Sequence, residues 1–406
     1  MKAKNLSLLI GISILFNCLW GCSTGPKNKL ETKKIPVVPE NISLEPLLNN
    51  TSYTLLETKQ QNLISKIKKL LVHNDNYYLL DASGKQVLVF DRLGRFLHQL
   101  NREGKGPGEY LSIDDFSIDR ENEMLVVLSA HQNKLFLYET TTFNHVRTVS
   151  YPDALLPTDL ECLSNNTYAL AKNHVGFEEP FNHFNLSIIN AEGRVIKETA
   201  PFSPALRNVL YSNRPFFRFK DQVYFANPAN RSVYALNNKD TIIQQTLFDF
   251  GNSNIDFPQN QGSKTPQVDF SELVQRMSSL KKILKEHSGI FGPLSYLETD
   301  KHLLIECIKE DRDVSIFICK QSQKAICVAP EDKLIMGLPK AYINIISVSP
   351  DEKSFIGTVA PYQIKEISRA LAEQGISSYG ADFDKINKQT AEGDNPILIE
   401  FDLKRF

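Results

Sequence analysis

The sequence lacks an excess of charge of either sign. Its 406 residues include 46 lysines and arginines and 47 aspartates and glutamates, which gives a formal net charge of −1. The net charge becomes −3 when the N-terminal segment that carries Lys2 and Lys4 is removed. Proteins that bind nucleic acid carry a basic patch or a basic excess, so we expect no nucleic-acid partner.

Common catalytic and metal-binding motifs are also missing. Neither G-x-S-x-G nor H-E-x-x-H occurs, which removes the usual hydrolase signatures. No C-x-x-C occurs, and the eight histidines show no ligand spacing. We therefore assign no catalytic residue and predict no metal site. The sequence identifies no cofactor and leaves open whether the protein is an enzyme.

Cysteine is scarce, with six residues in the chain. Cys18 and Cys22 lie near the N-terminus, and the other four are Cys162, Cys307, Cys319 and Cys327. We favour buried thiols for these four. The alternative is a disulfide among Cys307, Cys319 and Cys327, if neighbouring strands bring two of them within bonding distance.

The first 22 residues have the plan of a secretory signal. Lys2 and Lys4 precede an apolar core over residues 6–16, which is too short to span a membrane. The sequence Leu-Trp-Gly-Cys that ends at Cys22 resembles the lipobox of bacterial lipoproteins, although Trp20 replaces the usual small residue. We predict a lipoprotein signal peptide over residues 1–21 and lipidation at Cys22, which would attach the protein to a membrane. The alternative is ordinary cleavage and a soluble periplasmic protein.

Residues 22–50 are polar and contain several prolines, so we interpret them as a tether. The folded body is expected over residues 51–406. It opens with short apolar runs bounded by turn residues, at residues 64–72, 76–81, 86–91 and 95–100. Gly84 and Gly94 supply the backbone freedom that tight hairpins need. Four such strands form an antiparallel meander, which is one blade of a β-propeller.

The same pattern repeats along the chain. The third strands, aligned on Val87, Leu135, Leu186 and Val233, are separated by about 48, 51 and 47 residues, which is typical of propeller repeats. Residues 111–149, 155–199, 208–250 and 290–329 give four further blades. The sixth has three strands within residues 342–403, and residues 52–57 supply the fourth. The sequence thus predicts an all-β fold, a six-bladed β-propeller closed by N- and C-terminal strands, with no open edge and as a monomer.

Two helical insertions interrupt the later repeats. In residues 269–287, Phe270, Leu273, Met277, Leu280 and Leu284 share one helical face, and Gly289 can end the helix. In residues 363–374, Ile364, Ile367 and Leu371 do the same, and a mostly polar loop is expected over residues 377–392. These helices either cover the propeller or carry a partner, and covering is the commoner role.

Several segments resemble a known family. Residues 104–110, Gly-Lys-Gly-Pro-Gly-Glu-Tyr, follow Val89-Phe90-Asp91 and Gly94-Arg95-Phe96-Leu97 and resemble an NHL-type propeller repeat. Together with residues 53–58 and 394–398, they look like the six-bladed β-propeller lipoproteins of Gram-negative bacteria. The resemblance implies the fold, a lipid anchor, and an outer-membrane location facing the periplasm or the cell surface. It transfers no catalytic residue. Residues 104–108 lack the following Lys-Ser or Lys-Thr of a phosphate loop, so we interpret them as a crossing between blades.

Candidate binding residues lie where inner strands begin, because these strands line the channel of a propeller. Asp114 and Asp115 open the inner strand of the second blade, and Asp159 and Arg214 hold comparable places in the third and fourth. Paired carboxylates can hold Ca²⁺ or act as acid and base, but more often they bind backbone amides at a strand end. Because the sequence predicts a rigid ring with helical insertions and shows no recognisable catalytic set, we expect a binding module for a protein or saccharide partner. The alternative is a metal-dependent hydrolase or lactonase-like enzyme with a central-channel site.

Overall fold

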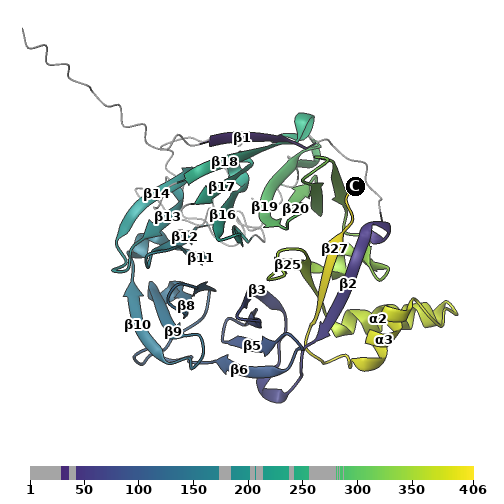
Figure 1. Cartoon of the computed structure of the whole chain (residues 1–406), viewed down its shortest axis with the longest axis horizontal. Helices are drawn as coiled ribbons and strands as arrows, with labels where there is room; N and C mark the ends of the chain where they lie inside the picture. The colour runs from purple at the N-terminus through teal and green to yellow at the C-terminus, as the bar shows by residue number, and fades with distance from the viewer. Residues whose placement is uncertain are drawn as a thin grey trace, which may run out of the picture.

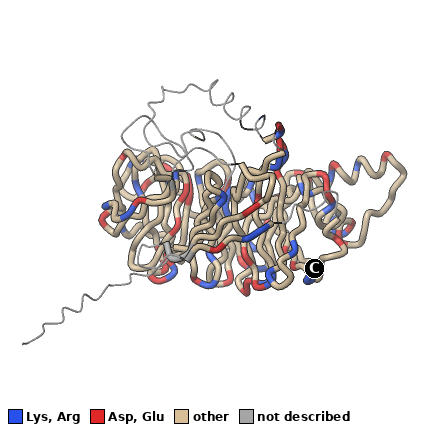
Figure 2. Tube along the Cα trace, turned by 90° about the horizontal axis from the view of Figure 1, so that it is seen from above, with Lys and Arg blue, Asp and Glu red and all other residues tan. Residues whose placement is uncertain are grey.

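Six blades, each built on a four-stranded antiparallel sheet, form a closed ring, and one of these sheets carries an additional parallel strand (Figure 1). The computed structural model describes residues 29–35, 43–172, 184–201, 206, 214–236, 242–255, 280, 282, 284–286 and 288–406. Seen edge-on, the ring is a flattened disc on which basic and acidic residues are interspersed (Figure 2). The six-bladed β-propeller expected from the sequence is confirmed.

Each blade runs from an inner strand at the channel to an outer strand at the rim. The first three blades follow the chain in order: β3 Ile67–His73, β4 Asn76–Asp81, β5 Val87–Asp91 and β6 Phe96–Leu100; β7 Asp115–Asp119, β8 Met124–Ser129, β9 Lys134–Glu139 and β10 His145–Ser150; β11 Asp159–Cys162, β12 Tyr168–Ala171, β13 Phe184–Ile189 and β14 Val195–Pro201.

The next two blades are also consecutive, and the sixth combines both ends of the chain. Their strands are β15 Phe216–Phe219, β16 Gln222–Asn227, β17 Ser232–Leu236 and β18 Ile242–Asp249; β19 Ile290–Glu298, β20 His302–Lys309, β21 Arg312–Cys319 and β22 Ala325–Val328; β25 Asn344–Val348, β26 Phe355–Val359, β27 Ile397–Leu403 and β2 Leu48–Leu55. A two-stranded sheet is formed by β23 Lys333–Ile335 and β24 Leu338–Pro339.

Short 3₁₀ turns connect several strands. They are η1 Glu45–Leu47, η2 Gln60–Asn62, η3 Ala130–Gln132, η4 Asp153–Leu155, η6 Pro228–Asn230, η7 Gly251–Ser253 and η8 Lys340–Tyr342. Two inner strands begin later than expected, at Asp115 and Asp159 instead of residues 111 and 155. In the third blade the turn η4 and then Pro157 occupy the expected start, and proline disfavours a position that must donate to a ladder.

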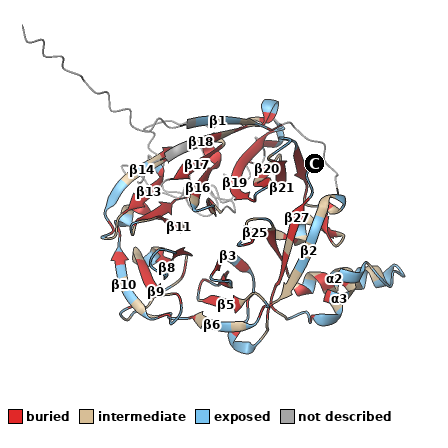
Figure 3. Ribbon diagram, viewed as in Figure 1, coloured by how far each residue is buried: buried red, intermediate tan, exposed pale blue. Residues whose placement is uncertain are grey.

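The second and third strands of most blades are buried on both faces. In β4, β8 and β17 nearly every side chain is buried, because each sheet packs between two neighbouring sheets. Outer strands such as β6 and β10 alternate between exposed and covered residues (Figure 3). This explains why the apolar runs in the sequence are almost unbroken where the strand is central.

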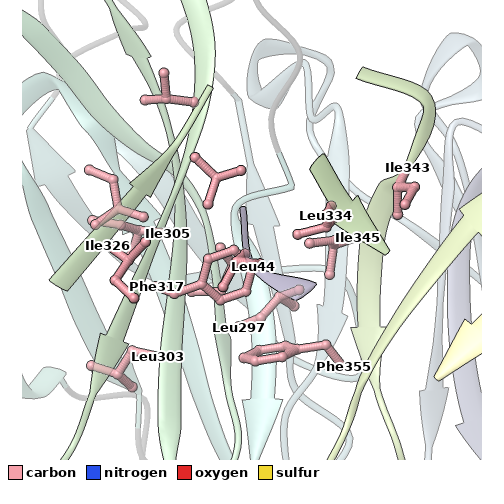
Figure 4. Packing of buried hydrophobic residues seen from close by; sticks show 14 of the residues in the cluster. Leu44, Leu297, Leu303, Ile305, Phe317, Ile326, Leu334, Ile343, Ile345 and Phe355 are labelled. Atoms are coloured by element: carbon pink, nitrogen blue, oxygen red, sulfur yellow. The ribbon is translucent and has the colours of Figure 1, made fainter. Parts of the chain in front are cut away.

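Apolar clusters lie between adjacent blades. Figure 4 shows the contact between the fifth and sixth blades, where Phe317 packs toward Phe355. The rings of Phe317 and Phe355 meet edge to face, with centroids 5.7 Å apart. Every blade therefore depends on its neighbours for burial, which makes the ring one cooperative unit.

The N-terminal strand β2 closes the sixth blade by pairing with the C-terminal strand β27, as predicted, with Tyr53 opposite Ile399. The strand begins at Leu48, earlier than the expected residue 52. Asn395, which is buried, strengthens the closure: its amide donates to the carbonyls of Glu57 at 2.9 Å and Asn62 at 3.0 Å, and its oxygen accepts from Ile64 N at 2.8 Å. These bonds fix the closing sheet to the first blade.

Part of the expected tether belongs to the folded body, which corrects the interpretation of residues 22–50. Strand β1 (Lys29–Lys34) pairs in parallel with β18, so the fourth blade has five strands. Ile35 and Leu44 are buried. The added strand satisfies backbone groups at an edge that would otherwise be open. Residues 22–28, including the predicted lipidation site Cys22, and residues 36–42 lie outside the described part.

The second insertion contains the predicted helix, α2 (Pro361–Glu373), with Ile364 buried. A further helix, α3 (Ala381–Gln389), stands where we expected a polar loop over residues 377–392. Its buried residues Phe383 and Ile386 are three positions apart and anchor it. Both helices project from the rim beside β2 (Figure 1).

Most of the first insertion lies outside the described residues. Leu280 and Leu284 are helical and buried, as their expected face requires. The helix ends with Ser288 at φ 48° and with Gly289 N donating to Leu284 O at 2.6 Å, so Gly289 lies at the predicted end. Across the described residues, no helix is both long and apolar enough to cross a membrane.

Residues 104–110 form a compact crossing between the first two blades. Gly104 N donates to Tyr110 O at 2.9 Å, and the Glu109 carboxylate accepts from Gly106 N at 2.7 Å. A side chain at residue 104 would collide with that carboxylate, which explains the glycine there. The four cysteines of the body are buried free thiols, as favoured from the sequence, and no disulfide joins Cys307, Cys319 and Cys327.

Candidate functional site

The centre of the ring holds a cavity of about 1260 Å³. All six inner strands contribute to its walls: β3, β7, β11, β15, β19 and β25. Because side chains alternate along a strand, every second residue of an inner strand faces the channel. The volume exceeds the roughly 300–1,000 Å³ of most small-molecule pockets, so the channel has room for an extended ligand.

Asp115 and Lys69 form a buried ion pair on one wall. Lys69 Nζ lies 2.9 Å from Asp115 Oδ2 and also donates to Leu160 O at 3.2 Å. Asp115 Oδ2 accepts from Leu160 N at 2.8 Å, so this carboxylate links three blades. Burial lowers the pKa of Lys69, but the negative charges of Asp115 and Glu161 outweigh it and leave the pKa raised. Lys69 is therefore charged at neutral pH.

Asp159 lies beside this pair, and its pKa is raised. Burial first, and then the charge of Asp115, raise the pKa of Asp159 to about 7. The Thr158 hydroxyl donates to Asp159 Oδ2 at 2.7 Å, which acts in the opposite direction. The carboxyl group of Asp159 is thus partly protonated at neutral pH, and it can either donate or accept a hydrogen bond.

A second layer of charge follows two residues further along the strands. Arg218 Nη2 lies 2.9 Å from Glu161 Oε1, and Arg218 Nε donates to the same oxygen at 3.2 Å. In the neighbouring blade, Ser117 Oγ accepts from Cys162 N at 3.1 Å. This layer joins the second, third and fourth blades, and Arg218 balances the charge of Glu161.

Arg214 extends from the start of the fourth blade to the sixth. Its Nη1 donates to Asn344 Oδ1 at 3.2 Å, and its Nη2 donates to Ile345 O at 2.5 Å. Its backbone N donates to Leu294 O at 3.2 Å, which places it beside Ser295 of the fifth blade. Burial lowers the pKa of Arg214, and the charges of Glu306 and Asp159 act against this. Arg214 stays a cation, because arginine does not lose its proton in proteins.

Asp114 is separated from the other candidates. Its carboxylate Oδ2 accepts from Ala130 N at 2.7 Å, at the start of the turn η3, and it does not line the cavity. Asp114 thus has the structural role that we considered more common, whereas Asp115, Asp159 and Arg214 line the channel. The adjacent pair of aspartates in the sequence is split because neighbouring residues of a strand point to opposite sides.

The match to a family model follows this geometry. The model described as "Domain of unknown function (DUF4934)" matches residues 32–402. The chain belongs to the DUF4934 family. The match confirms neither the NHL-type repeat nor the lipoprotein part of the resemblance, and both remain predictions.

Two solved structures are similar to this DUF4934 chain, and the first shares its fold. A Bacteroides fragilis NCTC 9343 protein named "Putative exported protein" has a TM-score of 0.68 at 16% identity, with 93% of this chain and 100% of that chain covered. A member of the DUF4221 family from Bacteroides vulgatus has a TM-score of 0.49 at 8% identity, covering 88% and 97%. A search of the curated proteins found no match.

Sequence reasoning missed several channel residues of the DUF4934 chain. They are Lys69, Glu161, Arg218, Ser295 and Asn344. A usable signal was present in two inner strands, where polar residues stand two positions apart: Asp115 and Ser117 in one, and Asp159 and Glu161 in the other. Within the described ranges, no group of three histidine, cysteine, aspartate or glutamate side chains is placed to hold a metal ion.

Proposed function

We propose that this DUF4934 chain is a lipid-anchored β-propeller of the bacterial envelope that binds a protein or saccharide partner in its central channel. The observation that carries the proposal is the cavity of about 1260 Å³, whose walls present charged and polar groups from all six blades. A channel that only closed the ring would be expected to be filled by apolar side chains.

The mixed lining supports a polar ligand. Lys69, Asp115 and Arg218 hold fixed charges inside the channel, and Asp159 can exchange a proton. Such preorganised polar groups give orientation and specificity to a bound ligand. The location is proposed from the N-terminal sequence, since Lys2, the apolar core and Cys22 form a signal with a lipobox-like end. The name of the Bacteroides fragilis protein of similar fold agrees with export.

The binding proposal is tested with the chain from Ser23 onward and a panel of envelope saccharides and peptides, by calorimetry. A bulky Thr158→Trp substitution in the channel wall should abolish binding, because Thr158 lines the cavity. The matched control is Leu93→Trp, on a turn where the side chain is 73% exposed and outside the channel. Binding that survives Thr158→Trp in a folded protein, or no binding to any member of the panel, would count against the channel as the site.

The anchor is tested in a Gram-negative host. Cys22→Ser should prevent incorporation of labelled palmitate and move the protein from the membrane to the soluble fraction, because stable attachment needs the acyl chains. Cys18→Ser is the control, since this cysteine lies inside the segment that we expect to be removed. Equal labelling of both variants would contradict the assignment of Cys22.

A second candidate function rests on the two carboxylates. Asp115 pairs with Lys69 at 2.9 Å, while the pKa of Asp159 is raised to about 7. Two carboxyl groups in such different surroundings can serve as base and acid in hydrolysis. We carry this candidate as a hydrolase or lactonase-like enzyme whose site lies in the central channel and includes these two residues. Asp159→Asn should then retain ligand binding and lose turnover of the bound saccharide, and equal turnover by both proteins would reject it.

A further inference from the structure

One corner of the channel has buried polar atoms with no partner. Arg214 Nε and Ser295 Oγ are shielded from solvent, and neither makes a hydrogen bond within the described residues. Among the buried side-chain atoms of the described residues that lack a hydrogen-bond partner, these two belong to residues that line the cavity. The two residues are direct neighbours, joined by the backbone bridge between the fourth and fifth blades. Native proteins rarely leave such groups unmatched, and because both residues line the cavity, a ligand there would supply the missing partners.

The charge of Arg214 is also not matched by an ion pair. Three other half-buried cations of the channel lining have carboxylate partners: Lys69 with Asp115 at 2.9 Å, Arg218 with Glu161 at 2.9 Å and Lys340 with Glu306 at 3.1 Å. In the part of the chain that the structure describes, no carboxylate lies within ion-pair distance of Arg214. Its two recorded acceptors are an amide oxygen and a backbone carbonyl, both neutral. A buried guanidinium with neutral partners is a favourable position for an anion.

The groups around this corner suit hydroxyls. Asp159, the first residue of β11, lies close enough to act on the charge of Arg214. Thr158 donates to it at 2.7 Å, and the side-chain amide of Asn344 lies at the guanidinium, where its Oδ1 accepts from Arg214 Nη1 at 3.2 Å. Carboxyl, hydroxyl and amide groups that can both donate and accept are the usual partners of sugar hydroxyls. A ligand for this corner therefore carries a negative charge and hydroxyl groups close together.

We propose that Arg214 and Ser295 form a carboxylate subsite of the channel, and that the ligand is an acidic saccharide, a sugar that bears a carboxylate on its ring. This inference rests on the proposed binding function and names the class of ligand. The carboxylate accepts from Arg214 Nε and Ser295 Oγ, and neighbouring ring hydroxyls bind at Asp159. No covalent step is involved.

The test measures calorimetric affinities for uronate trisaccharides, each paired with its carboxyl-reduced neutral counterpart. The wild-type chain should bind the acidic member about tenfold or more tightly, which is typical of a charge-assisted hydrogen bond. Arg214→Met should remove this preference and leave the affinity for the neutral sugar within about threefold. Arg95→Met is the matched control, because that arginine is paired with Asp91 and lies outside the channel lining, and it should keep the preference.

A milder variant covers the case in which Arg214→Met does not fold. Ser295→Ala removes the unpaired hydroxyl and should weaken binding of the acidic sugar by about threefold or more, with the neutral sugar unaffected. If the neutral sugar binds as well as the acidic one, the carboxylate subsite is overturned and the binding function stands. If a peptide with a free C-terminal carboxylate binds the channel and no saccharide does, the ligand class is overturned alone. If nothing in either panel binds, both proposals fall.

Discussion

Replacing Asp159 with asparagine should change how the stability of the protein depends on pH. The pKa of Asp159 is raised from an ordinary value of 3.8 to about 7 in the folded state, chiefly by burial and by Asp115. An acid whose folded pKa lies above its unfolded pKa costs no stability below pH 3.8. The cost grows as the pH rises to about 7 and is constant beyond that.

The size of this effect follows from the linkage relation. At 1.36 kcal/mol for each pH unit of separation, the cost reaches up to roughly 4 kcal/mol at pH 8, and the change between pH 5 and pH 8 is up to roughly 2.5 kcal/mol. Asparagine does not titrate, so Asp159→Asn should gain stability relative to the wild type by this amount on going from pH 5 to pH 8.

The assay is urea unfolding at the two pH values, followed by circular dichroism, since the single tryptophan of the sequence is Trp20 in the predicted signal peptide. Burial also lowers the pKa of His302 to about 4, but this acts equally in both proteins and cancels in their difference. Thr158→Val is the control: it removes the hydroxyl bound to Asp159 and keeps the carboxyl group, so the pH dependence should remain or steepen. A difference between Asp159→Asn and wild type that is the same at pH 5 and pH 8 would refute the reasoning.

Three further predictions concern the ring itself. Phe317→Ala should lower the free energy of unfolding by about 3–5 kcal/mol, because it opens a cavity between the fifth and sixth blades. The control Leu93→Ala, on an exposed turn, should change it by less than about 0.5 kcal/mol, and urea unfolding measures both. Asn395→Ala should cost about 3 kcal/mol in the same assay, because it leaves buried backbone groups at the closure unpaired, and a loss under 1 kcal/mol would contradict that role. Cys162 should resist alkylation in the native protein and react after unfolding, which mass spectrometry of the peptides would show.

The blade count and the closure could be predicted because their signal is local and repeated. Third strands recur at about 48 residues, and strand β2 carries an apolar pattern that matches its partner β27. Helix α3 was missed because its composition is polar, and its anchoring depends on two residues, Phe383 and Ile386. Strand β1 was missed because the sequence Lys-Leu-Glu-Thr-Lys-Lys has no apolar period of its own and pairs through its backbone.

The candidate site was predicted only in part, for a geometric reason. Position at the start of an inner strand identified Asp115, Asp159 and Arg214 as lining residues, but it cannot distinguish which of two adjacent residues faces inward, so Asp114 was included. The partners that set the charge state, such as Lys69, come from other blades. Contacts between segments so far apart in the sequence follow from the ring and not from any local pattern.

The parallel strand β1 limits how far the propeller can stand from a bilayer. If Cys22 carries lipid, seven residues, from 22 to 28, separate the acylated end from the strand that begins at Lys29. Fully extended, they span at most roughly 25 Å. With that anchor, the connection would be shorter than the 22–50 segment suggests. It would hold the rim of the fourth blade nearest the lipid headgroups, which would set the directions from which a ligand can reach the two mouths of the channel.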